Sequence, residues 1–161
     1  MRAEAIPLRR QSVDVGVMVE LTTEIMQIQA KALGVVLRIR IDDDVPDKVS
    51  LDRDKVAWAI TSLVGTALRH VRRVGGVIEL HVSYSADPST VRFSVRDNGP
   101  GIPPAQLARL LQRENWHPGS ALALLLVEDI AVAHGGVVTV DSKGDRDNHF
   151  TEVTFTIPTR G

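Results

Sequence analysis

The sequence lacks cysteine, a surplus of either charge and any long hydrophobic run. Without cysteine, disulfides and thiolate metal sites are excluded, and the composition fits a reducing compartment. The 19 basic and 20 acidic side chains are mixed along the chain, so no basic stripe favours nucleic acid. The longest apolar run, residues 121–127, is too short to span a bilayer, and the N-terminus lacks the apolar core of a signal peptide. We therefore expect a soluble, cytoplasmic module that contacts neither nucleic acid nor a membrane in this segment.

The length and composition predict one domain. The 161 residues, 43% of them hydrophobic, are enough to build a core. Residues 1–11 are basic and aperiodic, which is typical of a tail or linker, and we assign residues 12–161 to the domain. Residues 13–32 predict an amphipathic helix that ends near Gly34. Its expected apolar face consists of Val17, Leu21, Ile25, Met26 and Ile28.

The remaining chain alternates between strand and helix patterns. We expect strands at residues 35–41, 77–84, 91–96, 137–140 and 153–157, and helices at 54–71, 105–111 and 121–134. Asp42, Asp43 and Asp44 predict a solvated acidic loop, because their spacing lacks the other ligands of a calcium loop. The order of elements is typical of an α/β fold. We expect a two-layer α/β sandwich, in which three helices cover one face of a mixed, mostly antiparallel sheet. The other face is expected to be exposed or covered by a partner.

One glycine-rich turn stands out. Residues 96–102 read Arg-Asp-Asn-Gly-Pro-Gly-Ile and follow the alternating strand at 91–96, which delivers Asp97 to the turn. Gly99 and Gly101 can adopt backbone angles that side chains forbid and allow a ligand to approach the main chain. Taken alone, the pattern is more often that of a plain turn than that of a ligand site.

The helix at 54–71 carries a polar arc beside its apolar stripe. The arc consists of Ser62, Thr66, Arg69 and His70. It is either an ordinary exposed face or a wall that faces a ligand, because hydrogen-bonding groups and a cation converge within two turns. The residues alone favour the ordinary exposed face and leave the ligand-facing wall as the alternative.

Several motifs in the same order resemble the ATP-binding catalytic domain of sensor histidine kinases, over roughly residues 12–158. Residues 97–102 match the first glycine box of that family without a mismatch, and His134-Gly135-Gly136 matches the segment after its second glycine box. Asp52 occupies the position of the Asp that opens the N-box helix, and residues 154–158 match the usual last strand. The family shares the Bergerat fold with DNA gyrase and MutL-type repair proteins, which is the sandwich expected above.

The resemblance implies roles for individual residues. Asp97 would accept a hydrogen bond from the exocyclic amine of adenine, and Arg69 would contact phosphate. His70 would line the adenosine pocket, and the helix that starts near Gly119 would direct its free N–H groups at the phosphates. Thr66 and Arg69 would be the catalytic residues. The implied ATP-binding set is Ser62, Thr66, Arg69, His70, Asp97, Gly99, Gly101, Ile102, Arg109, Gly119, Ser120, Ala121 and Leu122.

The chain departs from the family at three places. Ser62 and Thr66 stand where the N box has two Asn, so the expected magnesium ligand is the shorter Thr66 hydroxyl. Ala121 and Ala123 replace glycines of the second glycine box and restrict positive φ. The segment 103–118 is a short lid without phenylalanine, and its phosphate-reaching cations are Arg109 and Arg113.

The implied reaction is transfer of the ATP γ-phosphoryl group to a histidine. None of the five histidines lies in a helical hairpin of the kind that carries the family's acceptor, so we expect a separate phosphoacceptor domain and a response regulator as partners. The module would then be part of a larger, membrane-linked sensor. Two alternatives stay open: a degenerate pseudokinase or interaction module, and an anti-sigma-type serine kinase of the same fold.

Overall fold

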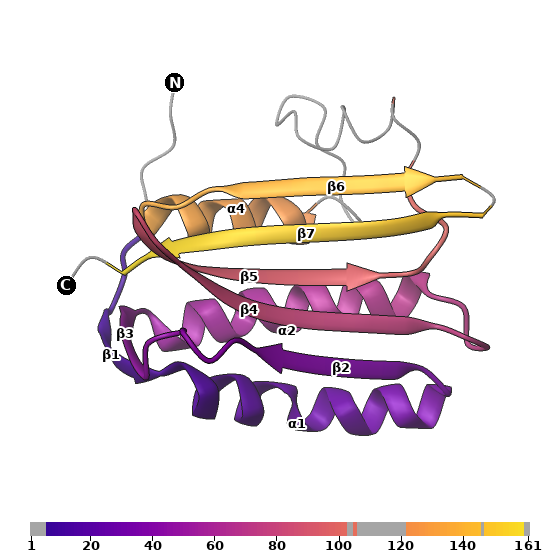
Figure 1. Cartoon of the computed structure of the whole chain (residues 1–161), viewed down its shortest axis with the longest axis horizontal. Helices are drawn as coiled ribbons and strands as arrows, with labels where there is room; N and C mark the ends of the chain where they lie inside the picture. The colour runs from indigo at the N-terminus through magenta and orange to yellow at the C-terminus, as the bar shows by residue number, and fades with distance from the viewer. Residues whose placement is uncertain (1–5, 103–104, 106–121, 146, 160–161) are drawn as a thin grey trace.

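The computed structural model describes residues 6–102, 105, 122–145 and 147–159 and shows a sheet backed by helices (Figure 1). The five-stranded sheet has the order β2-β4-β5-β7-β6. Only the β2–β4 pair is parallel, so the sheet is mixed and mostly antiparallel, as expected. Its strands are β2 (Val36–Ile41), β4 (Val77–Ala86), β5 (Ser89–Asp97), β6 (Val138–Gly144) and β7 (His149–Pro158).

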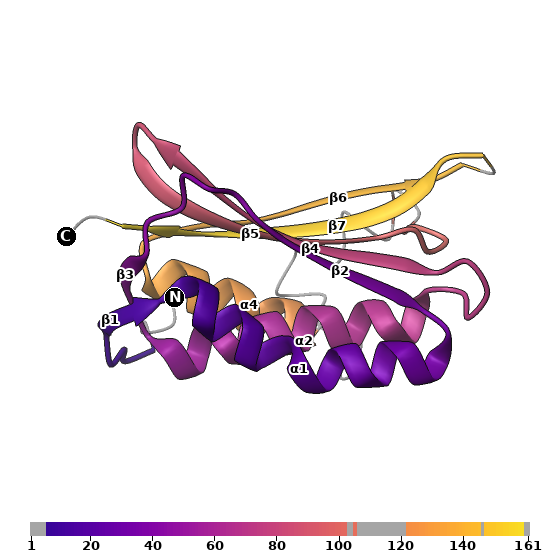
Figure 2. The same ribbon diagram turned by 60° about the horizontal axis from the view of Figure 1, so that its bottom comes forward.

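Three described helices cover one face of this sheet, which confirms the two-layer α/β sandwich (Figure 2). They are α1 (Val15–Leu33), α2 (Arg53–His70) and α4 (Leu122–Ala133). On the opposite face, the ion pairs Arg40–Glu79 and Arg96–Glu152 lie between neighbouring strands. None of the described helices is long and apolar enough to cross a membrane.

The core lies between the two layers. The apolar stripe expected along residues 54–71 is buried in full, and the strand residues that alternate toward the helices are buried with it. The stripe consists of Val56, Ile60, Leu63, Val64, Ala67 and Val71. Phe93 of β5 and Phe155 of β7 are opposite each other in the ladder and stack with their ring centroids 4.9 Å apart. The sandwich is therefore stabilised by burial of apolar helix and strand side chains against one another.

The ends of the helices follow their local chemistry. The Asp14 side chain accepts the Val17 N–H at the start of α1, and the Asp52 side chain accepts the Lys55 N–H at the start of α2. Gly34 ends α1 with φ 76°, a left-handed conformation that favours glycine. The predicted ends of α1 and α4 differ from the observed ones by one or two residues, whereas the predicted 105–111 helix lies outside the described residues except Ala105.

A second, two-stranded sheet was not predicted. It pairs β1 (Gln11–Asp14) antiparallel with β3 (Lys48–Leu51). Both strands have four residues, too few for a period of two to stand out from the flanking sequence. The adjacent Arg9 and Arg10 also contact the domain: the Arg9 N–H binds the Asp52 carboxylate, and Arg10 donates to the His134 carbonyl. The segment expected to be a linker is thus attached to the domain from at least Arg9 onward.

The expected apolar face of α1 is wrong. Met26 is buried, but Val17, Leu21, Ile25 and Ile28 are exposed, the last two to about two-thirds. The buried face is instead formed by Val15, Met18, Val19, Thr23, Met26 and Ala30. Helix α1 has apolar residues on two faces, and the face that includes Met18 and Met26 packs against the domain.

Candidate functional site

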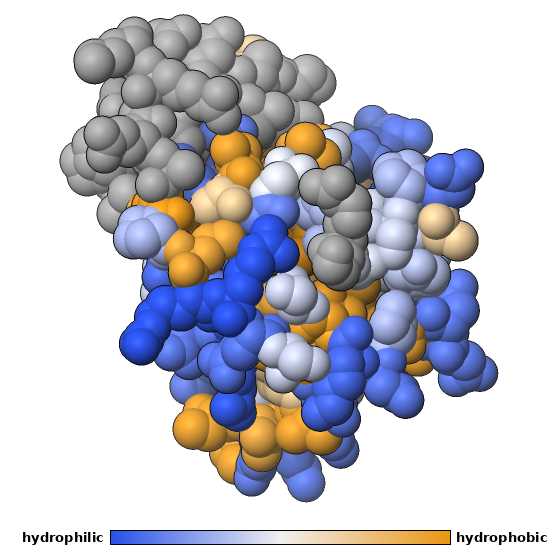
Figure 3. All heavy atoms as spheres, turned by 90° about the vertical axis from the view of Figure 1, so that its left-hand side faces the viewer, coloured by the Kyte–Doolittle hydropathy of each residue, from blue (hydrophilic) through white to orange (hydrophobic). Residues whose placement is uncertain are grey.

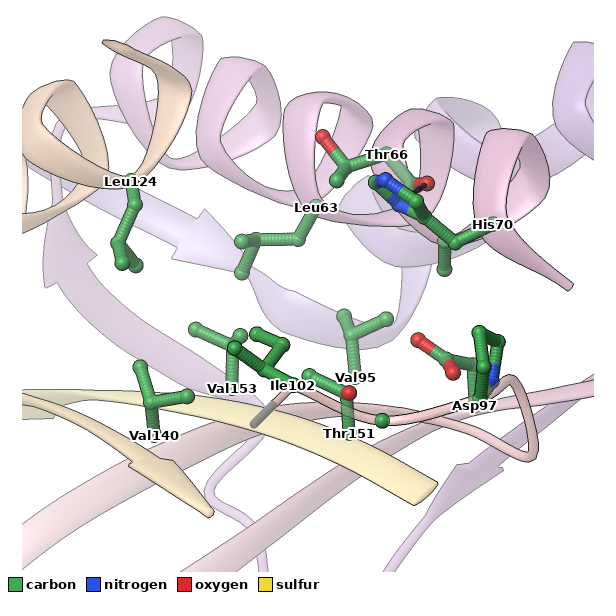
Figure 4. A pocket seen from close by; sticks show the side chains of 13 residues that line it. Leu63, Thr66, His70, Val95, Asp97, Ile102, Leu124, Val140, Thr151 and Val153 are labelled. Atoms are coloured by element: carbon green, nitrogen blue, oxygen red, sulfur yellow. Dashed lines mark hydrogen bonds between the residues drawn. The ribbon is translucent and has the colours of Figure 1, made fainter. Parts of the chain in front are cut away.

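A cavity of about 150 Å³ lies between the C-terminal half of α2 and the sheet, where β5 ends (Figure 4). Its floor is formed by inward-facing side chains of β5, β6 and β7, and its roof by α2 and the start of α4. The lining residues are Leu63, Thr66, Ala67, His70, Val95, Asp97, Pro100, Gly101, Ile102, Leu124, Val140, Thr151 and Val153. The walls are thus mainly aliphatic, with few polar groups.

Asp97 is the buried acid of this cavity, with 7% of its surface exposed. Its Oδ1 accepts the Gly99 N–H at 2.8 Å, and the side chain points up from the sheet toward His70 (Figure 4). Burial raises the pKa of the carboxyl above its ordinary value, while the Gly99 N–H and the nearby His70 partly oppose the rise. The site therefore offers a poorly hydrated hydrogen-bond acceptor within mainly aliphatic walls, which suits an apolar ligand that carries a donor group.

The turn after Asp97 is held against the strands by close contacts that require glycine. Gly101 has φ 78°, and a Cβ there would overlap the Lys143 carbonyl oxygen. A Cβ at Gly99 would lie 2.8 Å from the Asp97 Oδ1. The two glycines thus let the turn lie on the β6–β7 hairpin and keep the Asp97 carboxylate accessible from the cavity.

Two side chains of the β6–β7 hairpin bind the backbone of this turn. The Ser142 Oγ accepts the Ile102 N–H at 2.7 Å, and the His149 Nδ1 donates to the Gly99 carbonyl at 2.7 Å. Neither residue was predicted to belong to the site. They fix the position of the glycine turn without lining the cavity themselves.

Thr151 is a polar cavity residue that sequence reasoning missed. It lies opposite Asp97 in the β5–β7 ladder, so its side chain enters the same cavity. The Ser142 hydroxyl donates to the Phe150 carbonyl at 2.9 Å, and the Thr151 hydroxyl lies 3.0 Å from the same Oγ. Because the single Ser142 proton is used, Thr151 donates to Ser142 and its own lone pairs stay free to accept.

The polar arc of α2 lies at the opposite wall. The Thr66 hydroxyl donates to the Ser62 carbonyl at 2.9 Å and accepts from the Arg69 guanidinium at 3.2 Å. The His70 Nδ1 donates to the Thr66 carbonyl at 2.8 Å, which leaves its Nε2 without a partner among the described residues. Arg69 and His70 are both exposed and are the last two residues of α2, at the end of the helix that adjoins the cavity.

The described residues do not fit a magnesium site at Thr66. The proton of its hydroxyl is given to a main-chain carbonyl, and a guanidinium cation lies 3.2 Å from its oxygen, where it opposes a second cation. No group of three His, Cys, Asp or Glu side chains with metal-site geometry occurs in the described part of the chain. The arrangement instead places a permanent cation, Arg69, beside the hydroxyl.

The cavity brings together Thr66, His70, Asp97, Gly101 and Ile102 of the predicted set. Ser62, Arg69 and Gly99 lie next to it through the contacts above and do not line it. Leu122 is the first residue of α4. Arg109, Gly119, Ser120 and Ala121 lie outside the described residues. The ligand and catalytic roles assigned to these residues stay predictions.

The fold and the cavity together define an α/β sandwich with a small-molecule site on the helical side of its sheet. Within this class, the chain belongs to the family of histidine kinase-, DNA gyrase B-, and HSP90-like ATPases, whose model matches residues 51–161. The sandwich is accordingly the Bergerat fold, and the family expected from the sequence motifs is confirmed.

Individual relatives and solved structures agree with this assignment. The chain is 32% identical over 140 residues to the alginate biosynthesis sensor protein KinB of Pseudomonas aeruginosa, covering 83% of this chain and 23% of KinB. It is 30% identical over 128 residues to the signal transduction histidine-protein kinase BarA of Escherichia coli, covering 73% of this chain and 14% of BarA. The chain thus spans less than a quarter of either relative.

Two solved structures match almost the whole chain. Full-length ShkA in complex with AMPPNP superposes with a TM-score of 0.82 at 25% identity, covering 99% of this chain and 33% of ShkA. The catalytic domain of the histidine kinase ThkA superposes with a TM-score of 0.77 at 17% identity, covering 94% of this chain and 97% of that domain. The second likeness concerns the fold alone.

Proposed function

We propose that this chain is the ATP-binding catalytic domain of a two-component sensor histidine kinase. The observation that carries the proposal is the buried Asp97 carboxylate, held by the Gly99 N–H at the end of an aliphatic cavity. The adenine exocyclic amine carries two donors, which suit the acceptors Asp97 and Thr151 on neighbouring strands. Guanine presents a carbonyl oxygen at that position, which the carboxylate repels.

The other predicted residues have supporting roles in this proposal. Leu63, Val95 and Val153 would contact the faces of the base, and His70 would lie beside the nucleoside. Arg69 would neutralise phosphate charge from the mouth of the cavity. Gly119, Ser120, Ala121 and Leu122 would bind the phosphates, as the resemblance implies, with Arg109 as a further cation. Mg²⁺ bound by Thr66 is not part of the proposal, since that hydroxyl is already engaged.

The reaction proposed is transfer of the γ-phosphoryl group to a histidine of a separate phosphoacceptor domain, followed by transfer to a response regulator. The relatives support this assignment, because KinB is a sensor protein and BarA a histidine-protein kinase. We assign residues 12–161 to the catalytic domain and place it in the cytoplasm, on the side of the membrane where ATP is abundant.

Two measurements test the proposal. Calorimetric titration of the chain is expected to show binding of ATP, no binding of GTP, and little dependence of ATP affinity on Mg²⁺. Incubation of the full-length protein with ATP labelled in the γ-phosphate is expected to give an acid-labile, base-stable phosphohistidine. A chain that binds ATP but labels no histidine would contradict the kinase reaction and leave a nucleotide-binding regulator.

A further inference from the structure

The exposed apolar face of α1 forms a surface outside the cavity described above, because none of its residues lines that cavity. Val17, Leu21, Ile25 and Ile28 are exposed to between 49% and 68%, and they recur at helical spacing along one side of the helix. Figure 3 shows apolar atoms gathered at its lower edge, the side on which α1 lies in Figure 1. A continuous row of this kind is unusual for a surface that faces only water.

A groove separates this row from β2. Along α1 it is lined by Val17, Leu21 and Gln27, and on the other side by Ile39 and Ile41 of β2. The groove shares no lining residue with the nucleotide cavity. Strand β2 is the edge of the five-stranded sheet, so the groove runs between an edge strand and an apolar helix face.

The outer edge of β2 presents main-chain groups that the sheet does not use. Val36 and Asp42 donate their N–H groups to the β4 side, which directs the main-chain groups of the odd-numbered residues outward. The Leu37 carbonyl accepts the Gln27 side-chain amide at 3.1 Å. Within the described residues, nothing pairs with the N–H and C=O groups of Ile39 and Ile41. This is the geometry that accepts an added strand.

The charges beside the groove select among occupants. Glu20 and Glu24 line it and have no ion-pair partner in the described part of the chain, and the exposed Asp43 and Asp44 follow the end of β2. Such carboxylates repel an anionic lipid surface. In a two-fold pairing of β2 with a second copy, Arg38 and Arg40 would lie opposite arginines of that copy, which disfavours self-association.

We propose that this groove binds an extended segment of a partner protein, which adds to β2 as a further strand. Residues of the segment that point toward α1 alternate between aliphatic side chains, which cover the exposed row, and Lys or Arg, which pair with Glu20 and Glu24. Residues that point to the other face of the sheet include Glu or Asp opposite Arg38 and Arg40. This interaction surface is additional to the proposed kinase function and independent of ATP.

The test uses a synthetic peptide of about eight residues, a typical strand length. Its inward positions alternate Val and Lys, its outward positions alternate Glu and Thr, and a scrambled peptide of the same composition is the control. With isotope-labelled protein, we expect amide chemical shifts of Ile39 and Ile41 to move on titration, and the scrambled peptide to leave them unchanged.

Variants separate the parts of the surface. Leu21→Lys is expected to weaken peptide binding at least tenfold, whereas Val132→Lys on α4, also an exposed aliphatic helix residue, leaves it unchanged. A double variant with Glu20→Lys and Glu24→Lys loses the two exposed ion pairs with the lysines of the peptide. It is expected to bind the peptide about fivefold more weakly. Ile39→Pro removes an outward N–H and is expected to abolish binding. ATP affinity stays at its original value in the α1 variants.

Several results would overturn the proposal. They are equal binding of the designed and scrambled peptides, binding that ignores Leu21→Lys, and no shift at β2 with millimolar peptide. A dimer in analytical ultracentrifugation that Leu21→Lys dissolves would assign the surface to a second copy. Sedimentation with anionic vesicles that depends on Leu21 would assign it to a membrane.

Discussion

At the residue scale, the site depends on positions where the main chain leaves no space for a side chain. Gly101 and Gly75 have nearly the same backbone angle, φ 78° and 79°, so both resist substitution through conformation. They differ in surroundings: a Cβ at Gly101 would overlap the Lys143 carbonyl oxygen, whereas nothing lies within 4 Å of one at Gly75. A substitution at Gly75 therefore tests backbone strain alone, whereas a substitution at Gly101 tests strain together with close packing.

We predict that Gly101→Ala destabilises the domain more than Gly75→Ala and weakens ATP binding, which Gly75→Ala does not. A left-handed backbone angle costs an alanine about 1–2 kcal/mol at either position. Only at Gly101 must the turn also move away from β6, which displaces Asp97 and Ile102. Denaturant unfolding and calorimetric titration of both variants measure the two effects. Equal ATP affinities in the two variants would show that the contact with Lys143 does not position the turn.

At the element scale, the β6–β7 hairpin supports the glycine turn through hydroxyl groups. Ser142 connects the Ile102 N–H, the Phe150 carbonyl and the Thr151 hydroxyl. The pair Ser94–Thr154 has a similar hydroxyl contact at 2.8 Å, between β5 and β7, with no contact to the turn. Ser94 therefore provides a matched control for the loss of a serine hydroxyl.

Ser142→Ala is expected to weaken ATP binding about tenfold, because the Ile102 N–H loses its acceptor and Thr151 loses the group that orients its proton. Both Ser142→Ala and Ser94→Ala are expected to lower the free energy of unfolding by about 1 kcal/mol, but Ser94→Ala leaves ATP affinity unchanged. Calorimetry and denaturant unfolding of both variants provide the comparison. Unchanged ATP affinity in Ser142→Ala would show that the β6–β7 hairpin does not position the glycine turn for ATP binding.

The sequence predicted the parts of the site that are contiguous in the chain. Asp97, Gly99 and Gly101 share one motif, and the polar arc of α2 repeats with the helical period. Thr151 and Ser142 could not be found in this way, because they reach the site through the register of β7 with β5 and β6, which no local pattern encodes. Helix α1 was assigned the wrong face because both of its faces are apolar, and only packing selects between them.

At the scale of the whole molecule, one buried histidine joins three distant parts of the chain. The His134 Nε2 accepts the Asp52 N–H at 3.0 Å, and its Nδ1 donates to the Ile130 carbonyl at 2.8 Å. Arg10 binds the His134 carbonyl, so the N-terminal segment meets the start of α2 and the end of α4 at this residue. Burial lowers the pKa of His134 below 6.5, and the nearby positive charges of Arg10 and Lys55 lower it further. The hydrogen bond to Ile130 and the negative charge of Asp52 raise the pKa and offset part of this shift.

The neutral His134 is expected to make the domain less stable in mild acid. The unfolded chain binds a proton at a higher pH than the folded chain, so stability is full above the unfolded pKa of about 6.5 and falls as the pH decreases below it. Denaturant unfolding between about pH 5.5 and 7.5 measures the slope, and His134→Asn is expected to reduce it. A slope that persists in this variant would assign the acid sensitivity to other groups.

The central claim is that Asp97 reads the adenine base, and side-by-side titration of the original chain and Asp97→Asn with ATP tests it most directly. The Gly99 N–H binds Oδ1 of Asp97, so the amide that replaces the carboxylate would keep its oxygen there and turn its NH₂ toward the adenine amine. The account predicts that ATP affinity falls about 30- to 100-fold, equivalent to about 2–3 kcal/mol, while the domain stays folded. It also predicts a slightly higher free energy of unfolding, because a buried carboxylate is removed. Equal ATP affinity in the two proteins would contradict the account.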